Sequence, residues 1–301
     1  MIKNTEETFL NIQSQIIDKF CSFEDKNTAV ISEDKWERDE GGGGKTFVIE
    51  NGIFFDNCAV NFSSIQGNNL PQTALAKSLK KDAKYGYKAM GVSVITHPKN
   101  PNVPTSHMNV RLFGILNSQK EIHDWWIGGG YDLTPYIPFE EDIISWHSAA
   151  KECLNSINVN YYPIFSDNCN KYFKIPHRNE RRGVGGIFFD NITDFSLEDS
   201  AKMLESVALS YLNSYIKIMI RRKNHNFNDL QKDFQLVRRG RYVEFNLVYD
   251  RGTLFGLQSN GRIESILASL PSQTKWVYKK TDEHKRLEKV LLDAINKDWN
   301  V

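Results

Sequence analysis

The residues from 107 to 136 constrain the fold more than any other part of this chain. Polar or aromatic residues alternate with apolar ones over His107, Met108, Asn109, Val110, Arg111, Leu112 and Phe113. Such alternation predicts a β-strand with two different faces. One face would carry an imidazole, an amide and a guanidinium in a row, with neighbours roughly 7 Å apart. Asp132 follows glycines 128–130, which let a ligand or another chain approach the backbone closely.

Strands and helices are also expected along the rest of the chain. Hydrophobic periodicity predicts strands at 46–50, 53–62, 87–95, 184–190, 241–249 and 253–258. It predicts helices at 5–23, 71–85, 139–157, 196–222, 262–269 and 281–296. Neighbouring strands are joined by turns such as Asn51-Gly52 rather than by helices. This order favours an α+β fold with a broad, largely antiparallel sheet, and a single domain over 1–301.

The composition excludes several classes of protein. Lys plus Arg number 38 and Asp plus Glu number 37, a net charge of +1, so no global field attracts nucleic acid or a membrane surface. No run of 18 apolar residues predicts a membrane span. The four cysteines lack Cys-x-x-Cys spacing, and the first residues resemble no secretory signal. We therefore expect a cytoplasmic protein with reduced cysteines.

Glycines 41–44, followed by Lys45 and Thr46, suggest a phosphate-binding P-loop at first sight. That motif requires glycine five residues before Gly44, where Asp39 stands, and no strand precedes it. We therefore expect a flexible loop over a site, with a plain linker as the alternative.

Four of the seven histidines lie near the other polar signals, namely His97, His107, His147 and His177. Imidazole can ligate a divalent metal. However, no two of them have i, i+4 spacing, and no acid-rich segment accompanies them. A lone histidine on a helix face, such as His147, is more often part of a core. Spacing alone therefore leaves a metal site as the weaker alternative.

Arginines are dense in the second half of the chain, and Arg111 and Arg241 fall in expected strands. The guanidinium group pairs with planar carboxylates through two hydrogen bonds. A substrate with several carboxylates suits this pattern, with phosphates as the competitor. Asp132 is either a turn residue or a carboxylate that faces a partly positive group, such as pyrrole N–H donors.

Taken together, these motifs resemble the oxygen-dependent, aerobic coproporphyrinogen III oxidases of the bacterial type. The resemblance covers about residues 30–280. It is carried by His-Met-Asn-Val-Arg at 107–111, Trp-Trp-Ile-Gly-Gly-Gly-Tyr-Asp-Leu-Thr-Pro at 125–135, and by the segments 36–38 with 41–44, 61–63, 177–190, 239–253 and 257–271.

The resemblance implies a sheet flanked by helices on both faces and a homodimer formed through about 242–273. The substrate would be coproporphyrinogen III, a flexible tetrapyrrole with four propionates. Molecular oxygen would convert two propionates to vinyl groups, giving protoporphyrinogen IX for haem. No flavin, haem or nicotinamide is implied, and the chain has no Gly-x-Gly-x-x-Gly segment. Apolar residues alternating over Val243, Phe245, Leu247 and Leu257 also favour a dimer interface.

Roles for individual residues follow from the same resemblance. Substrate contacts are implied for Ser93, Asn109, Val110, Arg111, Asn260, Gly261 and Arg262. His107 would be the proton donor, and Asp132 would hold the pyrrole N–H groups. His97, His107, His147 and His177 would ligate a divalent cation, and whether a metal is needed stays open. Asn260 stands where relatives have glycine, and asparagine tolerates left-handed backbone nearly as well.

The implied chemistry uses the substrate's own electrons. A pyrrole deprotonated at N–H would react directly with oxygen, and the resulting peroxide would remove a hydrogen from the propionate β-carbon as carbon dioxide leaves. The protein would supply orientation and electrostatics. Two other functions remain alternatives: a carrier of anionic tetrapyrroles without chemistry, and a histidine-ligated metallohydrolase.

Overall fold

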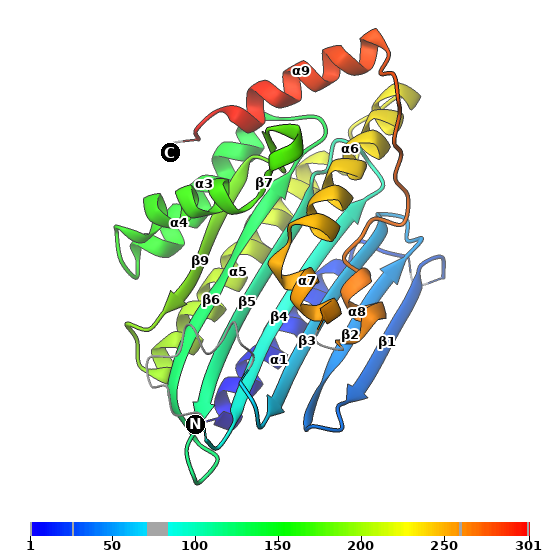
Figure 1. Ribbon diagram of the computed structural model, residues 1–301. Coiled ribbons are helices and arrows are strands. Elements are labelled where there is room, and N and C mark those ends of the chain that lie inside the picture. Colours follow the sequence, from blue (N-terminus) through cyan, green and yellow to red (C-terminus); the bar gives the residue numbers. More distant parts are fainter. Residues whose placement is uncertain (1, 26, 71–83, 259–260, 300) are drawn as a thin grey trace.

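A broad antiparallel sheet forms the centre of the molecule (Figure 1). The computed structural model describes residues 2–25, 27–70, 84–258, 261–299 and 301. Its strands are β1 (Val30–Glu37), β2 (Gly42–Glu50), β3 (Phe55–Gly67), β4 (Tyr87–Pro98), β5 (Thr105–Leu116), β6 (Ile122–Thr134), β7 (Lys174–Ile175), β8 (Glu180–Arg181) and β9 (Gly185–Ile192). Its helices are α1 (Ile2–Cys21), α3 (Glu140–Asn155), α4 (Tyr161–Tyr172), the 3₁₀ turn η1 (Pro176–Arg178), α5 (Leu197–Arg222), α6 (Asp229–Val248), α7 (Arg251–Gln258), α8 (Ile263–Leu267) and α9 (Asp282–Asn296).

The sheet has seven described strands in the order β1-β2-β3-β4-β5-β6-β9, and every neighbouring pair is antiparallel. The first six strands follow one another along the chain, whereas β9 joins the edge after α3 and α4. The predicted α+β class and the largely antiparallel sheet are therefore confirmed. None of the helices in the described ranges combines the length and apolar character needed to cross a bilayer.

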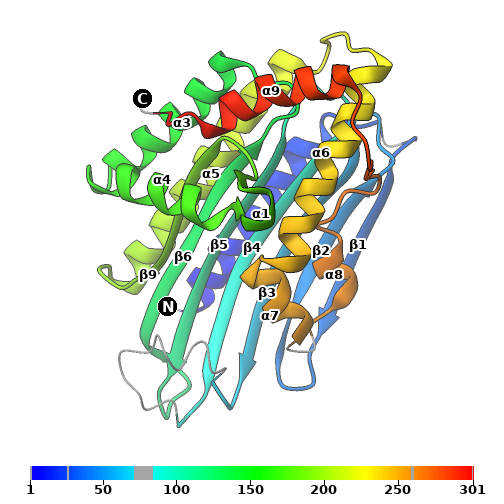
Figure 2. The same ribbon diagram turned by 45° about the horizontal axis from the view of Figure 1, so that its top comes forward.

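Helices cover the two faces of the sheet unequally. Helices α1 and α5 pack on one face, behind the sheet in Figure 1, and α6, α7 and α8 lie in front (Figures 1 and 2). The core lies under α1 and α5, where Met108, Val110 and Leu112 are almost fully buried. The other face, called here the open face, carries half-buried polar residues over β4 and β5.

Three sequence expectations differ from the structure. Residues 241–249 and 253–258 are helical, in α6 and α7, and are not strands. Asn228 and Gln231 form a capping box that starts α6, and the buried Phe234, Tyr242 and Phe245 recur at helical spacing. The prediction of a strand over 243–247 is therefore wrong, because its apolar residues follow the helical period.

The second difference concerns glycines 41–44. Glycines 42–44 belong to β2, so the expected flexible loop there is a paired strand. A side chain at Gly44 would meet the Trp36 ring and the Phe62 carbonyl. The third difference is that strands β1 and β6 and helix α4 were not predicted. Most of the helix expected at 71–85 lies outside the described residues.

Candidate active site

The alternation in β5 has the predicted consequence. His107, Asn109 and Arg111 are half-buried on the open face, and the intervening apolar residues enter the core. The register places three residues of β6 and β4 directly beside them: His107 faces Asp132, Asn109 faces Ser93, and Arg111 faces Gly128. Directly paired residues share one face of an antiparallel sheet. The predicted imidazole, acid, amide and guanidinium are thus brought together.

Asp132 is the buried centre of this group, with an exposed fraction of 1%. Arg182 donates two hydrogen bonds to its carboxylate, from Nη2 to Oδ1 at 2.7 Å and from Nε to Oδ2 at 3.1 Å. His107 Nδ1 lies 3.0 Å from the same Oδ1. Both oxygens are therefore engaged within the protein, and the expectation that Asp132 itself holds pyrrole N–H groups stays a prediction. Its contact with Nδ1 also suits orienting His107.

Arg182 compensates the buried carboxylate electrostatically. Its guanidinium carbon lies 4.1 Å from the ring centre of Phe173, 4.6 Å from that of Tyr242 and 4.8 Å from that of Phe245. Burial alone would raise the pKa of Asp132, but the Arg182 charge and the His107 hydrogen bond hold it below its ordinary value. Asp132 is therefore ionised at neutral pH.

The hydrogen bond to Asp132 determines which nitrogen of His107 is offered to a ligand. An ionised carboxylate only accepts, so Nδ1 carries the hydrogen. In the neutral ring, Nε2 is then the basic nitrogen. No partner of Nε2 is found among the residues that the structure describes, and a quarter of the side chain is exposed. His107 can therefore accept a proton at Nε2, or donate one after the ring is protonated.

Beside His107 the open face offers hydrogen-bond donors. Asn109 Oδ1 accepts from Arg111 Nη1 at 2.9 Å, which turns the N–H groups of the Asn109 amide away from that contact. Arg111 also pairs with Asp190 at 3.1 Å, and 40% of its side chain remains exposed. A half-exposed guanidinium next to amide N–H donors suits a carboxylate ligand.

The floor around Arg111 has very small side chains. Gly44, Ser63, Gly91, Arg111 and Gly128 are paired in one row across β2 to β6. A Cβ atom at Gly128 would lie 2.7 Å from the Arg111 guanidinium, and one at Gly91 would lie 2.8 Å from the Val110 carbonyl. Both glycines therefore leave room for Arg111 and for the neighbouring strand.

Helix α8 brings a second arginine to the same face. Arg262 is the N-cap residue of α8 and forms an ion pair with Asp34 of β1. Asp34 belongs to the paired row that continues through Thr46, Asn61, Ser93 and Asn109. Arg262 thus stands at the far end of the row that contains two predicted substrate contacts.

Comparison with known proteins decides the family. The family model for coproporphyrinogen III oxidase matches residues 4–300. A relative from Francisella philomiragia subsp. philomiragia, an oxygen-dependent coproporphyrinogen-III oxidase, is 44% identical over 300 residues, covering 97% of each chain. The chain belongs to the coproporphyrinogen III oxidase family.

Not all of the predicted substrate contacts lie on the open face of this oxidase. Ser93, Asn109 and Arg111 lie together on the open face. Val110 has an exposed fraction of 0% in the core on the opposite face, so its side chain cannot contact a ligand there. Gly261 lies beside α8, and its backbone N–H donates to the Gly256 carbonyl. Asn260 is outside the described residues.

Arg182 is the site residue that spacing did not single out as a partner of Asp132. The two lie 50 positions apart in the sequence, and only the density of arginines and the resemblance of segment 177–190 to the oxidase family marked the region. Arg241, expected in a strand, is instead an α6 residue paired with Glu244.

The four candidate metal ligands do not fit a shared metal site. His97 and His147 are buried, and each has both ring nitrogens hydrogen-bonded, to Thr105 and Ser269 for His97 and to Tyr162 and Val184 for His147. His177 contacts Tyr249 and Glu244. Within the described ranges, no three His, Cys, Asp or Glu side chains are grouped so that they could hold a metal ion.

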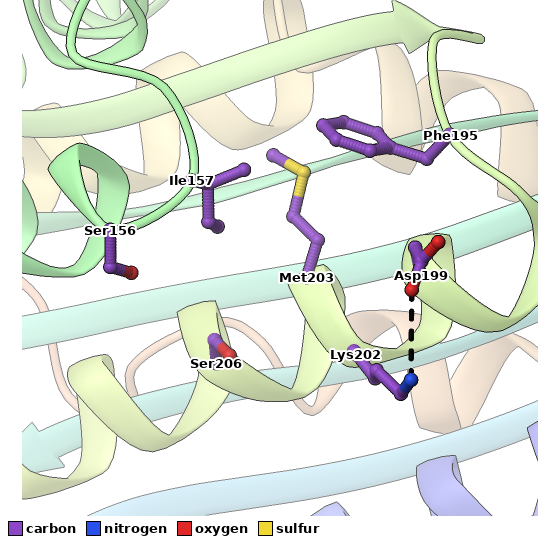
Figure 3. Close-up of a pocket in the computed structure, with 7 residues that line it drawn as sticks. All are labelled: Ser156, Ile157, Phe195, Asp199, Lys202, Met203 and Ser206. Carbon is purple, nitrogen blue, oxygen red and sulfur yellow. Dashed lines mark ion pairs between the residues drawn. The ribbon is translucent and has the colours of Figure 1, made fainter.

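A separate cavity of about 360 Å³ lies beside α5, away from this face (Figure 3). Its walls include Ile157, Phe195 and Met203, and Lys202 and Asp199 form an ion pair at 3.6 Å beside them. None of the site residues lines it.

Proposed function

We propose that the open face from β4 to β9 is where this chain oxidatively decarboxylates coproporphyrinogen III. Family membership carries the reaction itself: the chain is an oxygen-dependent coproporphyrinogen III oxidase of haem biosynthesis. The placement rests on one observation, the His107–Asp132 pair beside Asn109 and Arg111 on the open face. This arrangement offers an acid/base group next to carboxylate-binding donors.

The chemistry balances with one oxygen molecule for each propionate. A side chain CH₂–CH₂–COOH and O₂ give CH=CH₂, CO₂ and H₂O₂, so the substrate loses two electrons and oxygen gains them. The pyrrole supplies the electrons, and His107 Nε2 accepts or returns the N–H proton. Arg111 and the Asn109 amide hold a propionate, which keeps its β-carbon near the reacting ring. No step is assigned to a metal ion.

The test compares aerobic with anaerobic incubation of the enzyme with coproporphyrinogen III, followed by product fluorescence and carbon dioxide release. We expect protoporphyrinogen and carbon dioxide only with oxygen. Binding without product in both conditions would indicate a carrier. Oxygen-independent turnover that chelator abolishes would indicate a metallohydrolase.

Arg262 is expected to bind a peripheral propionate. Arg262→Ala removes a charged hydrogen bond, worth roughly 1.5–3 kcal/mol, so KM should rise about ten- to a hundredfold while kcat falls less. Arg221→Ala is the matched control: Arg221 is similarly exposed and pairs with Asp142 at 3.0 Å on the opposite side of the sheet. Steady-state kinetics of both variants test this, and an unchanged KM for Arg262→Ala would remove Arg262 from the site.

We also propose a homodimer formed through about residues 242–273. Because Val243, Phe245, Leu247 and Leu257 lie in helices α6 and α7, the support from strand alternation no longer applies. The support is now a set of exposed apolar side chains in this segment, with exposed fractions from 38% to 54%: Leu247, Val248, Leu257, Ile263 and Leu267. A monomer rarely leaves so many apolar side chains exposed in one segment, and a second copy would cover them.

Sedimentation at micromolar concentration should give twice the 34.7 kDa chain mass. Val248→Asp should shift the protein toward monomer, because it places a charge in the apolar interface. Val159→Asp, at an exposed valine outside the segment, should stay dimeric. A wild-type monomer at every concentration would reject the proposal.

A further inference from the structure

His97 lies at the junction of three elements and has an exposed fraction of 0%. Its Nε2 is 3.0 Å from the carbonyl oxygen of Ser269, just after α8, and its Nδ1 is 3.2 Å from the Thr105 hydroxyl of β5. The Thr105 hydroxyl also lies 2.7 Å from the Tyr136 hydroxyl. The imidazole therefore links β4 to the carboxyl end of α8 and to β5.

The partners determine the state of the ring. A carbonyl oxygen only accepts, so Nε2 must carry a hydrogen and donate it. Nδ1 then accepts from the Thr105 hydroxyl, and the ring is neutral. Burial, aided by the Arg239 charge, lowers the pKa of His97 to about 3, consistent with this state. A nitrogen that carries a hydrogen has no lone pair for a metal, and the other lone pair is in use.

Asn57 completes the contact from the neighbouring strand. It is paired with His97 in the register of β3 and β4. Its Nδ2 donates to the carbonyls of Ala268 at 2.9 Å and Leu270 at 2.7 Å. Together the two side chains bind three consecutive carbonyls in the segment that directly follows α8.

The same helix carries Arg262 at its other end. Between the two ends, Ser265 is held by the Thr46 hydroxyl at 2.7 Å and by Asn61 at 2.9 Å. With only five residues in α8, a shift at its carboxyl end reaches Arg262 directly. The contacts of His97 and Asn57 therefore fix where Arg262 stands over the open face.

We propose that His97 is a positioning residue, a neutral hydrogen-bond bridge that holds α8, and through it Arg262, in the place where substrate binds. It is not a metal ligand, in contrast to the role that family resemblance implies. The inference rests on the proposed function in one respect, the binding of a substrate carboxylate by Arg262.

The decisive comparison is between His97→Gln and His97→Leu. Glutamine can donate to Ser269 and accept from Thr105, but it is a poor substitute for a metal-ligating imidazole. Leucine fills the space without hydrogen bonds. We expect His97→Leu to raise KM roughly five- to tenfold, the effect of about one lost hydrogen bond, with a smaller change in kcat. His97→Gln should recover most of that loss.

Two further measurements separate positioning from general damage. His97→Leu combined with Arg262→Ala should raise KM no more than Arg262→Ala alone, because both act through one group. Amide hydrogen exchange over residues 261–270 should be faster in His97→Leu and close to wild type in His97→Gln. If His97→Leu does not fold, Asn57→Leu tests the same contact, with the same expected rise in KM and in exchange.

Metal analysis completes the test. Enzyme treated exhaustively with chelator should retain activity at least in part, and the His97 variants should match wild type in metal content. The proposal is overturned if His97→Gln is as impaired as His97→Leu, or if one divalent metal restores a chelator-inactivated wild type. An inactive wild type under every condition would instead reject the proposed function.

Discussion

Asp132→Asn should lose both stability and turnover, and the losses should have separate causes. Asparagine leaves the Arg182 guanidinium buried without a charge partner, and breaking a buried ion pair in this way costs about 3–5 kcal/mol of unfolding free energy. The variant also loses the carboxylate that fixes Nδ1–H on His107, so the fraction of rings with a basic Nε2 falls. Urea unfolding and steady-state kinetics measure the two effects.

A matched control separates them. Asp142 and Arg222 form another deeply buried ion pair, at 2.7 Å between α3 and α5. Arg222 keeps Glu141 as a second ion-pair partner, so Asp142→Asn should lose some stability, though less than Asp132→Asn, and should keep its turnover. Equal loss of turnover in both variants would mean that Asp132 acts through stability alone.

The stability effect should also depend on pH. The pKa of Asp132 is lower in the folded chain than in the unfolded chain. Its stabilisation is therefore fully present above the ordinary pKa range of a carboxyl group and is lost as pH falls through the folded-state pKa. The gap in unfolding free energy between wild type and Asp132→Asn should narrow in acid.

His107→Ala should show the largest loss of kcat with the smallest loss of stability. Removing a general acid/base group costs about 10²- to 10⁴-fold in rate. The Asp132–Arg182 pair does not need the imidazole, so it stays intact, and a quarter of the His107 side chain is already exposed. KM should change little, because the carboxylate-binding groups are elsewhere. Single-turnover and steady-state rates measure the effect.

His123→Ala is the control for this variant. His123 is a half-buried histidine of β6 whose Nδ1 contacts the Ile115 carbonyl at 3.1 Å. Its loss should leave kcat near wild type. A folded His107→Ala enzyme with near-normal kcat would transfer the acid/base role to another group.

Local patterns in the sequence predicted the parts of the fold that depend on neighbours in the chain. The period of two in β5 identified which side chains share the open face, and the Ser196 cap of α5 followed from its residue type. The strand predicted at 241–249 is wrong because valine and phenylalanine at alternate positions also fit a strand. In the structure this segment is helical and packs against β3 and β4. Edge strand β1 is too charged and exposed to produce a pattern.

The sequence predicted only those site residues whose arrangement depends on neighbours in the chain. The residues of β4 and β5 belong to strands with local alternation, so the face that each side chain shares could be deduced, whereas β6 was not predicted as a strand. The Asp132–Arg182 pair and the link from His97 to Ser269 join segments that are distant in sequence. No spacing rule connects such residues, and the family resemblance assigned His97 a ligand role that its hydrogen bonds do not support.

Strand β9 is the last strand of the sheet along the chain and lies at its edge, which has a consequence for how the site is completed during folding. Strands β1 to β6 pair with their sequence neighbours, so this part can form early in folding. Arg182 reaches Asp132 only when the chain returns after α3 and α4 to add β9 at the edge. Until then the carboxylate and imidazole lack their cation. A chain in which β9 has not docked would therefore contain His107 and Asp132 without the guanidinium that compensates the buried carboxylate, so completion of the site is tied to closure of this edge of the sheet.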